Sequence, residues 1–173
     1  MTRPTAPEVW LRGAVPRIEP LLQPVAHSLL QGGEEVRYGL ADLSPAQLRA
    51  RPEGAAAVAY HIRHAAGSLD RLFTYARGES LSGEQLARLA AEPRSNDEVV
   101  TASELISELD DAVERALTQL RATTGKELLE AREVGRAKLP STTLGLLFHA
   151  AEHTQRHIGQ AITTARVARA MVV

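Results

Sequence analysis

Apolar residues recur three or four positions apart along most of the chain, the spacing that places side chains on one face of an α-helix. Aromatic residues make up only 3% of the sequence, so leucine, alanine and valine must fill the core, and closely packed helices are favoured over a sheet. We expect no sheet of more than two short strands. The pattern predicts four long helices over residues 18–40, 55–77, 101–123 and 141–170, with short helices at 45–49 and 83–91.

Proline and glycine set the expected limits of these helices. Pro24 either kinks the first helix or marks its true beginning, and Gly32-Gly33 is expected to weaken it further on. Gly78 follows the second long helix as a residue suited to end it. Residues 125–140 are expected to form a connection.

Four long helices joined by shorter pieces predict an all-α protein with the architecture of a four-helix bundle. The connections allow either an up-and-down order or one with longer crossovers. Leu21 on the first helix and Phe148 and Val167 on the last are expected to face the core. Residues 1–15 are expected to form an irregular N-terminal segment, and residues 16–173 a single domain.

The composition is that of a soluble globular protein, with 44% hydrophobic and 24% charged residues. A formal net charge of −1 supplies no basic face, so no nucleic-acid partner is expected. The sequence shows no signal peptide and no apolar run long enough for a membrane span, so we expect a cytoplasmic protein with no membrane partner. Because cysteine is absent, any metal must be held by imidazole and oxygen ligands.

The spacing of the histidines suggests a metal-binding site. Three histidines of the last predicted helix are spaced i, i+4, i+8, and two of the second are spaced i, i+3, so neighbours within each set share a helix face. Facing helices could therefore supply two imidazoles from one side and one from the other, as metal sites in bundles often do. Five of the six histidines belong to these sets, namely His61, His64, His149, His153 and His157; the sixth is His27.

A single histidine on a helix is more often a surface or core residue than a metal ligand. Five of them on two helices, in a chain without cysteine, shift that balance towards a metal site. His153 and His157 are expected to share a face with the core residues Phe148 and Ile162 and so to point inward. Since buried imidazoles without partners are costly, an ion or a hydrogen-bonded network is expected beside them.

The two segments that carry these histidines resemble motifs of one family. The segment HAAEHTQRHIGQ at residues 149–160 resembles the last-helix motif of the DinB-like (YfiT-like) metal-dependent enzymes, His-x3-His followed by x-Gly-Gln. The segment HIRHAAGSLDR at residues 61–71 resembles their second-helix motif, a histidine followed by small and apolar residues and then an acidic–arginine pair. In pattern and order the resemblance covers residues 21–166.

The resemblance implies a four-helix bundle, often dimeric, with a three-histidine site for one divalent ion. Zinc is the favoured metal, with nickel, iron and manganese as alternatives. One departure is Ile158, since many relatives have arginine after the final ligand, whereas here Arg156 precedes it. By motif, the implied metal ligands are His64, His153 and His157. Alternative ligands, or residues that contact the ligands, are His61, His149 and Gln160.

The same resemblance leaves several reactions open. Some relatives are S-transferases that use bacillithiol, mycothiol or glutathione, and one branch is a mycothiol-dependent maleylpyruvate isomerase. We therefore expect a homodimeric, metal-dependent thiol S-transferase or hydrolase that acts on a small molecule, with a low-molecular-weight thiol as co-substrate in the first case. The alternative is a non-catalytic metal-binding or stress-associated helical bundle.

No catalytic residue is assigned from the sequence. Asp70 and Glu152 are the acidic residues closest to the histidine motifs. Glu152 is expected to point partly away from the ligand face, which suits a solvated residue better than a general base. Asp70 is expected to pair with Arg71 or with a helix partner.

Overall fold

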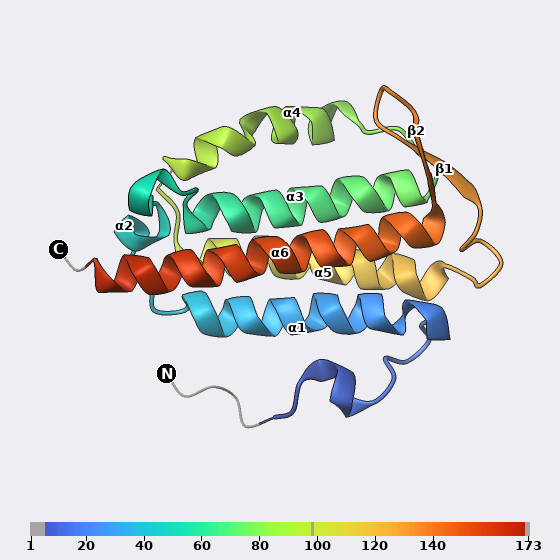
Figure 1. Ribbon diagram of the computed structural model, residues 1–173, viewed down its shortest axis with the longest axis horizontal. Helices are drawn as coiled ribbons and strands as arrows, with labels where there is room; N and C mark the ends of the chain where they lie inside the picture. The colour runs from blue at the N-terminus through green and yellow to red at the C-terminus, as the bar shows by residue number, and fades with distance from the viewer. Residues whose placement is uncertain (1–5, 98, 172–173) are drawn as a thin grey trace.

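The computed structural model describes residues 6–97 and 99–171. Its four long helices are α1 (Gln23–Leu40), α3 (Val58–Ala76), α5 (Ala102–Ala122) and α6 (Thr143–Ala170). In Figure 1, α6 crosses the front of the molecule between α1 and α3, and it packs most extensively on α3. The predicted all-α four-helix bundle is confirmed. Within the described residues, no helix is both long and apolar enough to span a membrane.

The order of the helices includes a crossover. Helix α4 (Gly83–Ala91) and the 3-10 turn η4 (Glu92–Asn96) run back along the outside of α3, so that α3 and α5 start at the same end of the bundle (Figure 1). Between α5 and α6, strand β1 (Ala131–Val134) pairs antiparallel with β2 (Leu139–Thr142), and the described residues hold no further strand. The remaining short elements are η1 (Val9–Arg12), η2 (Pro20–Leu22), α2 (Pro45–Leu48) and η3 (Pro52–Gly54).

Side-chain caps explain where several helices begin. Thr101 accepts a hydrogen bond from the backbone N–H of Glu104 (3.2 Å) at the start of α5. Thr142 accepts one from the backbone N–H of Gly145 (3.0 Å) at the start of α6. Such caps satisfy donors that the first turn of a helix leaves unpaired. Pro24 lies in the first turn of α1, where a missing N–H costs little, so it marks the start of this helix.

Gly32 has a packing role that its low helix propensity does not predict. The residue is buried on α1, and a Cβ added to it would lie 2.5 Å from Cδ1 of Ile158 on α6. Ile158 is itself fully buried and has little room to move. The close approach of α1 and α6 therefore requires glycine here, and the packing offsets its low helix propensity.

Three residues expected in the core are exposed. Leu21, Phe148 and Val167 have exposed fractions of 64%, 61% and 43%, so their predicted burial is wrong. Leu21 lies in η2, where the helical period does not yet apply, and Leu22 is buried in its place. On α6 the buried stripe passes through Leu147, and the next residue is turned away from it by about 100°.

The segment before α1 packs along that helix (Figure 1). The backbone N–H of Val9 donates to the side chain of Gln31 (3.0 Å), and Arg12 forms an ion pair with Glu34 (2.5 Å). Residues 1–5 lie outside the described part of the chain. The division into residues 1–15 and 16–173 stays a prediction.

Candidate metal centre

Three histidines meet where α3 faces α6. His64 comes from α3, and His153 and His157, one turn apart, come from α6. Each side chain offers one ring nitrogen, and these three nitrogens lie within 4.8 Å of one another. The Nε2 atoms of His64 and His153 are 3.0 Å apart. The structure therefore gathers the three residues that the family motif implies as ligands into one half-buried group, which we call the histidine cluster.

The cluster lies on a different side of α6 from the one expected. Five residues separate His157 from Ile162, which corresponds to about 140° of helix rotation. Ile162 packs beside Gly39 of α1, where an added Cβ would lie 3.3 Å from its Cγ1, whereas His157 faces α3. Because α6 contacts both α1 and α3, one side of it builds the core and another presents the histidines.

The remaining histidines relate to the cluster in different ways. His61 is 7% exposed, and its Nδ1 lies 3.1 Å from Nδ1 of His157. His149 is exposed, and its Nδ1 lies 3.3 Å from Oε1 of Glu152. His27 is not one of the three grouped histidines, and its Nε2 lies 2.9 Å from the carbonyl oxygen of Gly13. Both His61 and His149 therefore lie next to the cluster, since the ring centroids of His149 and His153 are 5.5 Å apart.

The polar residues considered alongside the histidine motifs have other partners. Asp70 accepts a hydrogen bond from Nε2 of Gln85 (2.7 Å), whereas Arg71, its neighbour in the motif, pairs with Glu92. Glu152 forms an ion pair with Arg156 on the exposed face of α6. Gln160 is exposed, and no hydrogen bond within the described residues joins it to a histidine. None of these side chains is placed to act directly on an ion in the cluster.

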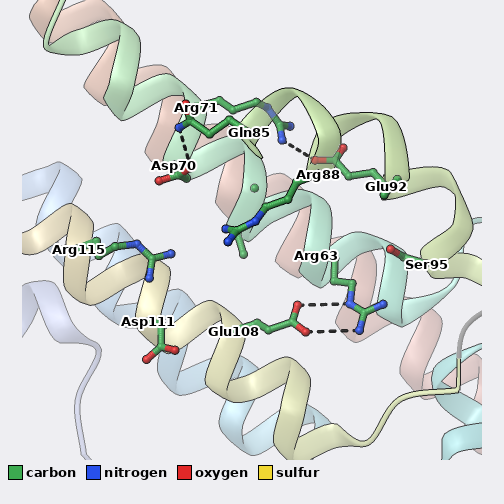
Figure 2. A pocket seen from close by; sticks show the side chains of 13 residues that line it. Arg63, Asp70, Arg71, Gln85, Arg88, Glu92, Ser95, Glu108, Asp111 and Arg115 are labelled. Carbon is green, nitrogen blue, oxygen red and sulfur yellow. Dashed lines mark hydrogen bonds and ion pairs between the residues drawn. The ribbon is translucent and has the colours of Figure 1, made fainter. Parts of the chain in front are cut away.

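Glu92 of η4 is the carboxylate that contacts the cluster, and it lies outside both histidine motifs. Its Oε2 lies 2.7 Å from Nδ1 of His64, and its Oε1 accepts a hydrogen bond from Nη1 of Arg71 at 2.6 Å (Figure 2). Glu92 and Arg71 are each only 8% exposed. Because 28 residues separate Glu92 from His64, no spacing rule within one helix could have found this contact.

The surroundings favour neutral rings at two positions of the cluster, His153 and His157. Burial, followed by the positive charge that His64 would carry, lowers the pKa of His153. The same two causes, with the other nearby histidines, lower the pKa of His157 to about 4. For Glu92, burial opposes ionisation, but hydrogen bonds from His64 and Arg71 outweigh it and the pKa is lowered. The result is an anionic Glu92 and neutral rings at His153 and His157. Neutral imidazole is the form of histidine that binds metal.

The donor set fits a divalent transition metal. Two imidazoles from one helix and one from a facing helix can occupy three corners of a tetrahedron, leaving the fourth for water or a substrate. Nitrogen ligands suit zinc, nickel and iron. Nδ1 of His153 is buried without a hydrogen-bond partner, so the three rings are not supported equally by their surroundings.

A separate cleft of about 510 Å³ lies between α3, α4 and α5. Figure 2 shows its charged walls, including the pair formed by Arg63 of α3 and Glu108 of α5. Within the described part of the chain no histidine lines this cleft, but Arg71 and Glu92 do. The buried Arg71–Glu92 pair therefore forms a wall of the cleft and also contacts the histidine cluster.

A helical bundle with a three-histidine cluster between two of its long helices defines a candidate metalloprotein. The family model described as "DinB superfamily" matches residues 29–161. Because this match spans most of the sequence, the chain belongs to the DinB superfamily.

A solved structure supports the fold. The crystal structure of a conserved protein from Enterococcus faecalis is 20% identical, with a TM-score of 0.69 over 86% of this chain and 97% of that one. At this identity the likeness establishes the shared fold alone. No curated protein gives a significant match to the sequence.

Proposed function

We propose that this protein binds one divalent metal ion through His64, His153 and His157 and uses it as a metal-dependent enzyme. The observation that carries the proposal is the convergence of three ring nitrogens within 4.8 Å from two facing helices. The lowered pKa values of His153 and His157 support it, because protons then compete poorly for the nitrogens at neutral pH.

Zinc is the metal that this donor set favours, with nickel, iron and manganese as alternatives. Three neutral nitrogen ligands and an open position are the arrangement of catalytic zinc sites. When bound, the metal supplies a Lewis acid that lowers the pKa of a water or thiol at the open position. The chain contributes the rings, their fixed orientation and a half-buried setting.

Transfer of a low-molecular-weight thiol of the bacillithiol, mycothiol or glutathione type is the reaction we favour over hydrolysis. A hydrolase benefits from a carboxylate base beside the metal. Both oxygens of Glu92 are already engaged, by His64 and by Arg71, so this residue is poorly placed to accept a proton. Since the chain has no cysteine, the sulfur would come from the co-substrate.

The first test is the metal content of protein purified without a metal-affinity tag. We expect close to one equivalent of a divalent metal, and turnover when thiols are offered together with electrophilic small molecules. Ester or amide cleavage without a thiol would favour the hydrolase instead. Full metal content with no turnover across both panels would favour the alternative, a non-catalytic metal-binding bundle.

A further inference from the structure

We propose that Glu92, held in place by Arg71, is the positioning residue that turns His64 into a metal ligand by fixing its tautomer. This inference rests on the proposed metal site and adds to it a residue from outside the histidine motifs. It concerns the hydrogen-bonding state of one ring, which can be measured separately from activity.

The contact with Glu92 sets the tautomer of neutral His64. A carboxylate only accepts hydrogen bonds, so the 2.7 Å contact between Oε2 and Nδ1 requires the proton of the neutral ring to lie on Nδ1. Nε2 then carries the lone pair, and this is the atom that lies 3.0 Å from Nε2 of His153. The nitrogen that faces the cluster is therefore the one able to bind metal.

Arg71 holds the carboxylate in the orientation that this requires. A guanidinium only donates hydrogen bonds, so Nη1 of Arg71 keeps Oε1 of Glu92 at 2.6 Å and leaves Oε2 for His64. Both side chains are nearly inaccessible to solvent, so water competes poorly for either oxygen. The opposite charges of Arg71 and Glu92 compensate each other, and Oε2 of Glu92 is directed towards the ring of His64.

Gly67 provides the space in which this pair sits. A Cβ on Gly67 would lie 2.8 Å from Oε1 of Glu92 and 2.9 Å from Nη1 of Arg71. Any larger residue on this face of α3 must displace one of the two groups. The motif segment of α3 thus supplies the ligand His64, the space beside it and the arginine that orients its partner.

The three rings of the cluster differ in the partner that their Nδ1 atom contacts. His157 contacts the ring of His61 through Nδ1 (3.1 Å), and Nδ1 of His153 is buried without a partner. Within the described residues, His64 is the member of the cluster that hydrogen-bonds to a carboxylate. Loss of Glu92 should therefore affect His64 first.

Glu92→Gln is the most informative substitution because it preserves size while changing the donor pattern. Arg71 can only donate, so it should retain the amide oxygen and leave the amide NH₂ facing His64. That NH₂ would donate to Nδ1 and move the proton of the ring to Nε2. The nitrogen facing the cluster would then be protonated, and metal would have to displace this proton to bind.

The experiment measures zinc affinity by competition with a chromophoric chelator and, in metal-free protein, the His64 tautomer by long-range ¹H–¹⁵N NMR. The NMR is recorded well above the usual imidazole pKa of about 6.5. We expect an Nδ1–H tautomer in the wild type and Nε2–H in Glu92→Gln, with zinc affinity reduced about 10- to 100-fold. The control is Glu108→Gln, which removes a carboxylate that lines the same cleft and pairs with Arg63, and it should leave both readouts unchanged.

Two further variants test the proposal independently in case Glu92→Gln does not fold. Gly67→Ala displaces the pair without removing a charge, and it should also weaken zinc binding while the helical circular dichroism stays intact. Adding Arg71→Met to Glu92→Gln releases the amide to rotate, and it should restore part of the Nδ1–H population. This partial rescue is a non-additive effect that a merely structural role would not produce.

The outcomes separate the two proposals. A wild-type protein that binds no zinc or other divalent metal overturns the metal site itself. A wild-type protein that binds zinc, with unchanged affinity and tautomer in both Glu92→Gln and Gly67→Ala, overturns only the positioning role of Glu92. An Nε2–H tautomer of His64 in metal-free wild type overturns that role as well.

Discussion

The Nε2 atoms of His64 and His153 lie 3.0 Å apart, although 89 residues separate the two histidines in the sequence. In this chain without cysteine, two imidazoles that face each other through ring nitrogens form an arrangement that a metal ion would stabilise. The separation of the two residues along the chain also means that the packing of α3 on α6 creates the cluster.

Alanine substitution within the cluster should remove most of the bound metal. We expect His64→Ala, His153→Ala and His157→Ala each to do so in equilibrium dialysis, because two imidazoles hold a divalent ion far less tightly than three. His27→Ala should retain full metal content, since its ring contacts Gly13 and not the cluster.

His61→Ala should have a smaller effect on metal content than His64→Ala. Its ring contacts His157 from outside the group of three. Loss of metal in His61→Ala, with retention in His64→Ala, would show that the α3 ligand lies one turn earlier.

The stability of metal-free protein should depend on pH because the pKa of His157 is lowered to about 4. The unfolded chain titrates near the ordinary imidazole pKa of about 6.5. Between these values the unfolded state binds more protons, so the free energy of unfolding is highest above about pH 6.5 and falls as the pH drops towards 4. Urea titrations across this window should show a shallower loss for His157→Gln, and parallel curves for the two proteins would contradict the assignment.

Two glycine substitutions should have opposite effects on stability. Gly32→Ala places a Cβ 2.5 Å from Cδ1 of buried Ile158, and it should cost about 1–3 kcal/mol. Gly159→Ala on α6 meets no atom within 4 Å, and its better helix propensity should add up to about 1 kcal/mol. Chemical denaturation of both variants measures the difference, and equal effects would rule out close packing of α1 on α6 at this position.

Adjacent residues of α6 should differ sharply in their contribution to stability. Leu147 is fully buried and Phe148 is 61% exposed. Leu147→Ala should therefore cost about 2–5 kcal/mol, whereas Phe148→Ser should change the free energy of unfolding by less than about 0.5 kcal/mol. A large loss in Phe148→Ser would indicate that a second subunit covers this residue.

We expect the protein to form a homodimer, on the basis of its family. Light scattering at micromolar concentration should then give about twice the chain mass of 18.7 kDa. A mass equal to that of one chain would contradict this expectation.

The sequence alone determined the helices of this protein. Periodic apolar residues predicted four long helices close to those observed, because this signal acts within a few residues along the chain. The caps at Thr101 and Thr142 are equally local, since each joins residues three positions apart. The i, i+4 spacing of His153 and His157 likewise follows from the geometry of one helix.

Only the tertiary structure decided which helix faces meet. It placed Phe148 in solvent, made Gly32 a contact point with Ile158, and brought Glu92 of η4 against His64. Each of these facts depends on the packing of segments that are distant in the sequence, and a periodic pattern carries no information about which neighbour a helix face will meet. For the candidate metal centre, the sequence therefore identified the histidines, and the packing of α3 against α6 and η4 supplied the carboxylate partner of His64.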